Sequence, residues 1–374
     1  MSGNFIPVYQ TMLGGNERLY VSQCLDTNWI SSKGEFVARF EDDFADYLDV
    51  GHATSVNNGT TALHLALHTL GIGPGDEVIV PTFTYIASVN AIAYVGATPV
   101  FVDSDPLTWN IDVALVSKKI TAQTKAIMCV HLYGAVCAMD ELQELCKIYN
   151  LRLIEDVAEA FGSQYRGRYA GSFGDIATFS FFGNKTITTG EGGMVVSKDR
   201  EIISRAAHLK SQAVSPDREY WHDEIGFNFR MTNICASIGV AQLEQADSVI
   251  AAKRRLSAWY QEELLDLPLT FQVESSDTVH TYWMVSVLAP TGSMRDSIRK
   301  ALKEAGVETR PLFFPAHIMT VFASNEAFPV AEDLSIRGMN LPSYPALTRE
   351  QVSYICMVIR QTLQDRKGTG PLIF

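Results

Sequence analysis

Short apolar runs alternate with helical patterns along residues 52–197 of this 374-residue chain. The runs that we predict as strands are 53–56, 77–81, 98–102, 126–132, 151–154, 176–181 and 193–197. Several are almost uninterrupted, which is typical of strands covered by helices on both faces. Helical patterns lie between them, for instance at 61–70, 86–94 and 139–150. This alternation predicts an α/β fold with an open, mostly parallel sheet of about seven strands.

The pattern changes beyond residue 230. A long helical pattern runs from Thr232 to about Leu265, and its second half is charged, so we expect it to leave the large domain. Strand patterns at 282–288 and 308–314 then accompany helical patterns at 294–305 and 350–363. We therefore predict a large α/β domain over residues 1–250 and a smaller α+β domain over residues 251–374.

Composition narrows the class of protein. Apolar residues make up 47% of the chain, charged residues only 19%, and the formal net charge is −12. This charge argues against nucleic acid or an anionic membrane surface as a partner. No apolar stretch is long enough to cross a membrane. The six cysteines are scattered without metal-type spacing, which indicates reduced thiols in a cytoplasmic protein, and we expect no metal.

One lysine and one aspartate suggest a cofactor. Lys185 lies between an aromatic strand, which ends at Phe182, and the Gly-rich turn that begins at Gly190. Asp156 ends the apolar run 151–156, at the edge of the sheet where such folds bind ligands. A lysine that bonds covalently to pyridoxal phosphate (PLP), and a carboxylate that keeps the pyridine nitrogen protonated, are a required pair in PLP chemistry. Taken alone, Lys185 fits a solvated loop lysine and Asp156 fits a helix cap.

A second candidate site is a phosphate cradle. The turn Asn57–Thr61 joins a strand to a helix, and free amides at a helix N-terminus bind phosphate, although the same residues suit an ordinary helix cap. Ser180 is a hydroxyl in an otherwise apolar strand, so it requires a partner, either backbone or phosphate. His131 ends another strand on the same side and is a candidate pocket residue.

Together these motifs resemble the DegT/DnrJ/StrS family of PLP-dependent sugar aminotransferases. The resemblance runs in family order from Ile6 to Ser343 and includes the segments 29–34, 81–85, 155–160, 181–190 and 226–232. It implies the type I fold of aspartate aminotransferase, with PLP as the cofactor.

The resemblance assigns roles residue by residue. Lys185 matches the Schiff-base lysine, and Asp156 matches the partner of the pyridine nitrogen. The positions that match cofactor contacts are Gly59, Thr60, Thr61 and Ser180 at the phosphate, Tyr85 stacked on the ring, and Glu159 near its phenolic oxygen. Asn228 matches an asparagine that reaches the phosphate of the neighbouring subunit, which implies a homodimer with shared active sites. The residues expected near the substrate are Ser31, His131, Arg310 and His317.

The implied reaction moves the amino group of L-glutamate to C4 of a nucleotide-linked 4-keto-6-deoxy sugar. The segments 181–190 and 220–223 are most similar to members that act on GDP-4-keto-6-deoxy-D-mannose in O-antigen synthesis. Alternatives are a UDP- or dTDP-linked sugar, amination at C3, a PLP-dependent sugar dehydratase, or a non-catalytic regulator. The dehydratase branch carries histidine at the lysine position, so Lys185 argues against it.

Overall fold

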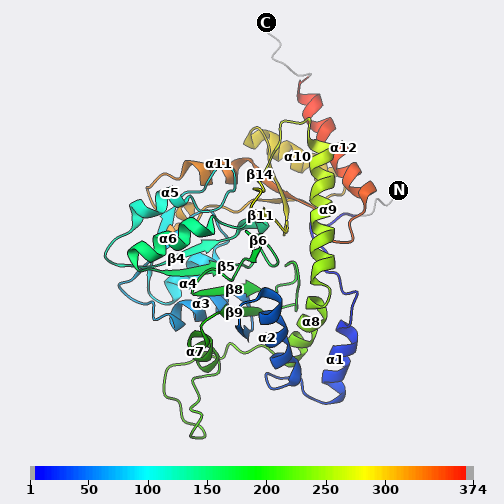
Figure 1. Ribbon diagram of the computed structural model, residues 1–374. Coiled ribbons are helices and arrows are strands. Elements are labelled where there is room, and N and C mark those ends of the chain that lie inside the picture. Colours follow the sequence, from blue (N-terminus) through cyan, green and yellow to red (C-terminus); the bar gives the residue numbers. More distant parts are fainter. Residues whose placement is uncertain (1–4, 368–374) are drawn as a thin grey trace.

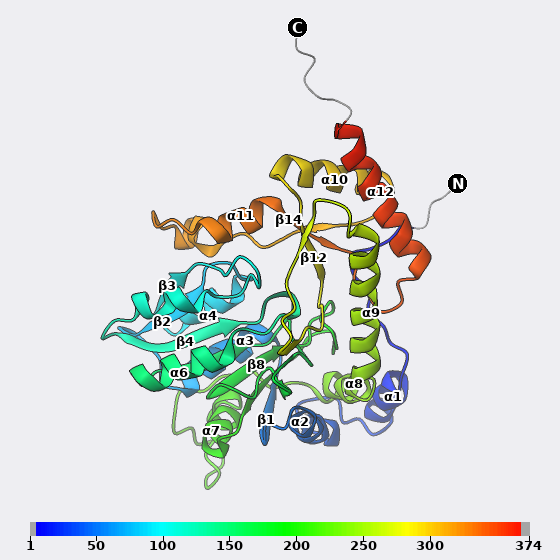
Figure 2. The same ribbon diagram turned by 45° about the horizontal axis from the view of Figure 1, so that its top comes forward.

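Residues 5–367 are described by a computed structural model, and the tail that begins at Gly368 lies outside them. The main sheet has seven strands in the order β1-β9-β8-β5-β4-β2-β3 (Figures 1 and 2). Its strands are β1 (His52–Val56), β2 (Glu77–Pro81), β3 (Thr98–Val102), β4 (Thr124–Val130), β5 (Arg152–Asp156), β8 (Ile176–Ser180) and β9 (Gly193–Ser197). Only β9 runs antiparallel to its neighbours in this sheet. The predicted seven-stranded, mostly parallel sheet is confirmed.

Helices cover both faces of the sheet because alternate strand residues point to opposite sides. Ile79 packs in the same cluster as residues of α2 (Glu35–Leu48), α6 (Met139–Tyr149) and α8 (Asn233–Leu243). Its neighbours Val78 and Val80 pack with α3 (Gly59–Thr69), α4 (Ala87–Tyr94) and α7 (Arg200–Lys210). The other helices at this end are α1 (Glu17–Asp26), α5 (Val113–Val116) and the 3₁₀ turns Ser117–Lys119 and Leu132–Gly134.

The C-terminal part builds a second, antiparallel sheet in the order β10-β12-β14-β13. Its strands are β10 (Thr270–Phe271), β12 (Val285–Leu288), β13 (Arg310–Pro311) and β14 (Gly338–Leu341). The helices are α9 (Ala246–Leu264), α10 (Gly292–Glu304), α11 (Pro329–Arg337) and α12 (Arg349–Lys367), with 3₁₀ turns at Ala316–Ile318 and Thr320–Phe322. A small sheet of β6 (Gln164–Tyr165), β7 (Arg168–Tyr169) and β11 (Thr278–Val279) connects the two parts.

Three details differ from the expectation. The long helical pattern is two helices, because α8 ends at Leu243 and α9 starts at Ala246, without a glycine or proline at the break. The expected strand 308–314 pairs only at β13, since the segment contains Pro311 and soon leaves the sheet. Strand β14 was not predicted from its four residues.

The expected domain boundary at residue 250 lies within α9. No helix in the described chain is long and apolar enough to cross a membrane.

Candidate active site

Lys185 lies on the loop that connects β8 to β9. Its side chain is only 13% exposed, and Nζ is 3.9 Å from Oε1 of Glu159. The same nitrogen is 4.0 Å from the centre of the Trp283 ring. Burial lowers the pKa of Lys185, while the charges of Glu159 and Asp156 act in the opposite direction. The amine is therefore closer to its neutral form than a surface lysine, as a nucleophile and proton carrier requires.

Asp156 is the last residue of β5 and is buried at the carboxyl edge of the parallel strands. Its Oδ2 accepts a hydrogen bond of 2.7 Å from Ser88 Oγ, and its Oδ1 accepts one of 3.1 Å from the amide of Ala158. Burial raises the pKa of Asp156, and both hydrogen bonds and Lys185 oppose this shift. A buried carboxylate held by neutral donors is suited to face a cationic group in a ligand.

Glu159 lies between Lys185 and the 3₁₀ turn after β4. Its Oε2 accepts a hydrogen bond of 2.9 Å from the amide of Tyr133, whose φ of 56° lies in the left-handed region. Burial raises the pKa of Glu159 to about 7, although the nearby Lys185 charge lowers it. This carboxyl group can therefore exchange a proton near neutral pH.

The predicted phosphate cradle is assembled where α3 begins next to β8. Asn58 caps α3 by accepting a hydrogen bond from the Thr61 amide, so the amides of Gly59 and Thr60 lie at the open helix terminus. A Cβ atom on Gly59 would lie 2.7 Å from the Cβ of Ser180. Glycine is thus required for the helix to approach the serine, as expected if amides and hydroxyl share one phosphate.

Other predicted contacts are exposed at the surface of this chain. Tyr85 is 59% exposed, and its ring centre is 5.8 Å from that of Phe313. Asn228 is exposed, and its Oδ1 accepts a hydrogen bond from Arg230. Ser31 is also exposed and accepts a hydrogen bond from the Asn233 amide through its carbonyl.

Among the residues expected near the substrate, Arg310 and His317 differ in exposure. The Arg310 side chain is 46% exposed and its guanidinium lies over the Tyr9 ring, so it can reach a ligand. His317 is buried, and its two ring nitrogens contact Thr82 Oγ1 at 2.8 Å and Glu332 at 3.3 Å. These contacts fasten the loop after β13 to the end of β2 and give no open ring face to a substrate.

His131 is also displaced from its expected role. It is fully buried, with Nε2 3.1 Å from Glu155 and Nδ1 accepting a hydrogen bond from the Cys137 amide. Cys129 and Cys137, which are separated in the sequence, have sulfur atoms within 4.8 Å of a ring nitrogen of the histidine and of each other. Because both histidine nitrogens are engaged within the protein, this cluster braces the strand ends beside Asp156 and leaves His131 no route to a substrate.

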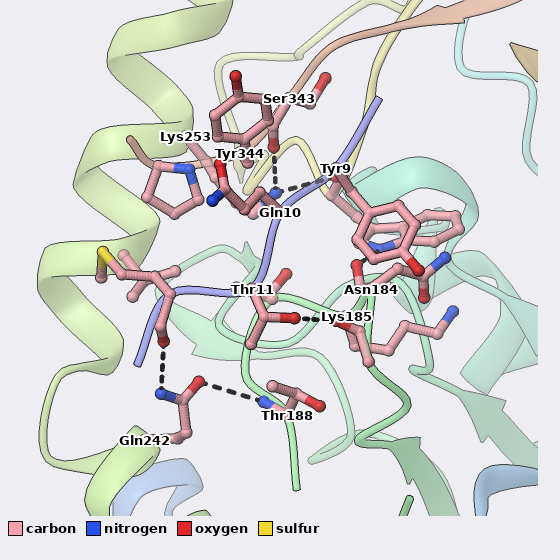
Figure 3. Close-up of a pocket in the computed structure, with 16 residues that line it drawn as sticks. Tyr9, Gln10, Thr11, Asn184, Lys185, Thr188, Gln242, Lys253, Ser343 and Tyr344 are labelled. Carbon is pink, nitrogen blue, oxygen red and sulfur yellow. Dashed lines mark hydrogen bonds between the residues drawn. The ribbon is translucent and has the colours of Figure 1, made fainter. Parts of the chain in front are cut away.

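The structure also reveals site residues that the sequence analysis did not single out. Ser88 holds Asp156, and Trp283 contacts Lys185. Lys185, Trp283 and Lys253 of α9 line one pocket, and Lys253 is buried. Figure 3 shows the N-terminal segment with Thr11 between Lys253 and Lys185. The sequence offered only a weak signal for them: Trp283 lies within the strand pattern 282–288, and Lys253 is one of several charged residues in a long helical pattern.

The chemistry of these residues suits the groups of PLP. The cradle at Gly59 and Ser180 suits the phosphate, and the buried Asp156 suits a protonated ring nitrogen. Lys185 would supply the amine for covalent attachment, and two hydrogen bonds fix the Asp156 carboxylate in place.

Comparisons with known proteins agree with this geometry. Residues 12–360 match the DegT/DnrJ/EryC1/StrS aminotransferase family. The chain is 56% identical over 363 residues to a GDP-perosamine synthase of Escherichia coli O157:H7, covering 97% of this chain and 100% of that protein.

Solved structures show the same fold. The aminotransferase TlmJ from Streptoalloteichus hindustanus superposes with a TM-score of 0.93 at 31% identity, covering 97% of this chain and 100% of the other. The PLP form of the sugar aminotransferase Spr1654 from Streptococcus pneumoniae superposes with a TM-score of 0.89 at 27% identity, covering 96% and 98%. PLP is the cofactor of the present enzyme, and the chain belongs to the DegT/DnrJ/EryC1/StrS aminotransferase family.

Proposed function

We propose that this enzyme transfers the amino group of L-glutamate to C4 of GDP-4-keto-6-deoxy-D-mannose and forms GDP-perosamine. The observation that carries the proposal is the 56% identity, over 97% of this chain and 100% of the relative, to a GDP-perosamine synthase. The pairing of a largely enclosed Lys185, whose side chain is 13% exposed, with a buried Asp156 supports an active transaminase rather than a regulator. Six free cysteines are consistent with work in the cytoplasm.

The chain's own residues divide the chemistry. When bound, PLP supplies an electron sink for the carbanion formed at the carbon that carries the amino group. Asp156 favours positive charge at the ring nitrogen, which strengthens this sink. Lys185, with its lowered pKa, takes a proton from one carbon and returns it to another. Glu159 lies 3.9 Å from the Lys185 amine, close enough to influence when that amine holds its proton.

We also propose a homodimer with shared active sites, in which Asn228 reaches the phosphate of the neighbouring subunit. Asn228 is exposed on a segment that follows a loop with outward-facing apolar side chains. Tyr220 is 93% exposed and Ile225 is 86% exposed on this loop, and exposed apolar groups of this kind favour contact with a partner.

The function is tested with a panel of keto-sugars. Purified enzyme, PLP and L-glutamate are incubated with GDP-, UDP- and dTDP-linked 4-keto-6-deoxy sugars and with a 3-keto sugar, and products are identified by mass spectrometry and NMR. We expect efficient amination at C4 of the GDP-linked sugar and formation of 2-oxoglutarate. Preference for another nucleotide, or for C3, would overturn the assignment of substrate but leave the transaminase chemistry intact.

The shared site is tested by complementation. Lys185→Ala and Asn228→Asp chains are each inactive if the proposal holds, because one lacks the amine and the other places a negative charge at the phosphate. Co-expression creates heterodimers in which one site draws both residues from intact copies. Partial recovery of activity is expected, whereas purified heterodimers without activity would contradict a site shared between subunits.

A further inference from the structure

The Lys185 amine changes partners during a catalytic cycle, since it is free whenever the cofactor carries the transferred amino group. A lysine has a long, flexible side chain, and holding it at one place costs conformational entropy. We propose that Trp283 is a positioning residue whose ring holds the free Lys185 amine at the reaction centre. This inference rests on the catalytic role proposed for Lys185, but not on the identity of the sugar.

The Trp283 ring contacts the Lys185 amine on the side of the C-terminal part of the chain. Lys185 Nζ lies 4.0 Å from the ring centre, within the range in which an aromatic face attracts a cation. Trp283 is 5% exposed, so water screens this contact little. The acidic groups that act on the same amine are Glu159 and Asp156, both of which belong to the large domain. The ring thus faces an amine that is attracted from elsewhere by two carboxylates.

Three contacts fix the ring itself. Its Nε1 donates a hydrogen bond of 2.7 Å to the carbonyl of Asn184, the residue immediately before Lys185. The backbone carbonyl of Trp283 accepts a hydrogen bond of 3.0 Å from the amine of the buried Lys253. The ring also stacks on Tyr133 with a centroid distance of 6.1 Å and an interplanar angle of 5°. Contacts at the indole nitrogen, at the ring face and at the backbone carbonyl keep Trp283 in one orientation. A ring with a fixed orientation can hold the flexible lysine side chain in place.

This arrangement joins the two parts of the chain at the reactive group. Trp283 lies two residues before β12 of the C-terminal sheet, whereas Asn184 and Lys185 belong to the loop between β8 and β9. Lys253 on α9 also donates a hydrogen bond of 2.8 Å to the carbonyl of Ser343, which follows β14. Packing alone would not require the indole nitrogen to bond to the residue next to the reactive lysine.

The test measures the free amine directly in enzyme that contains its cofactor. Enzyme is treated with L-glutamate and freed of 2-oxoglutarate, so that Lys185 carries no covalent bond. The rate at which acetic anhydride labels Lys185 is then followed against pH by peptide mass spectrometry, with the exposed Lys300 as internal reference. Wild type is compared with Trp283→Met, which keeps an apolar side chain without a ring, and with Trp283→Phe, which keeps a ring without the indole nitrogen.

We expect Trp283→Met to lower the pKa of Lys185 by about 0.4 to 1.5, because the cation loses its aromatic partner. Both half-reactions should slow by about 10- to 100-fold, with little change in KM for the sugar. Trp283→Phe should recover part of both effects, since a phenyl face also attracts a cation. A Met variant with the wild-type pKa of Lys185 and wild-type half-reaction rates would overturn the inference.

A second measurement avoids any loss of folding. Fluorinated tryptophans weaken the attraction of the ring face for a cation and change the packing little. Incorporated in place of the five tryptophans of the chain, they should lower the pKa of Lys185 in wild type in proportion to the number of fluorine atoms, but not in Trp283→Phe. An equal shift in both proteins, or none in wild type, would contradict the proposal. If glutamate fails to release Lys185 in wild type, the proposed transaminase reaction fails instead.

Discussion

Lys253 makes the pH dependence of stability predictable. Burial lowers the pKa of its amine to about 7 from an ordinary value of 10.5, even though the amine donates hydrogen bonds to two carbonyls. Between these pH values the unfolded chain binds more protons at this group than the folded chain, so stability rises with pH. At about 1.4 kcal/mol per pH unit, Lys253 adds up to about 3 kcal/mol between pH 7 and pH 9.

The substitution Lys253→Met removes this dependence and keeps most of the buried side-chain volume. We expect urea denaturation, at fixed protein and PLP concentrations, to show wild type gaining stability relative to the variant by up to about 3 kcal/mol from pH 7 to pH 9. The other titrating groups contribute equally to both proteins, so their effect cancels when the stability difference between wild type and variant at pH 7 is subtracted from that at pH 9. The matched control is Lys300→Met at an exposed site, which should show no such change. A difference between wild type and Lys253→Met that does not vary with pH would refute the reasoning.

Four further changes test the site. Lys185→Ala should abolish turnover but retain the fold, and measurable transamination without added amine would contradict its role. Asp156→Asn should slow the reaction by about 10²-fold or more, as loss of one preorganised charge does, and a rate within about twofold of wild type would point to another group. Gly59→Ala should weaken PLP binding, measured by fluorescence titration, because its Cβ would lie 2.7 Å from the Ser180 Cβ; unchanged affinity would contradict the cradle. Glu159→Gln should flatten the apoenzyme's stability profile between pH 4.5 and 7, where the wild-type carboxyl keeps a proton that the unfolded chain releases, so that wild-type stability falls as pH rises; equal slopes would contradict this.

Sequence patterns predicted the main sheet well because strands buried on both faces leave uninterrupted apolar runs, as in 176–181. They predicted the short elements poorly. Strand β14 has four residues, too few to show a period, and the break between α8 and α9 occurs without a glycine or proline. The residue types and positions of Lys185 and Asp156 suggested PLP chemistry, which uses both a lysine and a carboxylate, and the resemblance of the surrounding motifs to a known family made it the expectation.

The surroundings of His131 and His317 could not be predicted from the sequence. His131 and His317 were predicted near the substrate because they follow strands or lie on a candidate loop, yet both are buried and bonded within the protein. A sequence states which residue ends a strand, but not which neighbouring donor or acceptor its side chain will meet. That choice depends on contacts between segments far apart in the chain, such as Thr82 with His317.

The sequence by itself determined the class of fold, because that depends on local periodicity, and its motifs indicated PLP and proposed the pair Lys185 and Asp156 through their resemblance to a known family. Only the tertiary structure decided what surrounds the reactive amine. Trp283 is 98 positions from Lys185 in the sequence, and Lys253 is 68 positions from it. Even so, the Trp283 ring contacts the Lys185 amine, and Lys253 donates a hydrogen bond to the Trp283 carbonyl. Packing of the C-terminal sheet and α9 against the β8–β9 loop brings them together, and no pattern within a single segment encodes that contact.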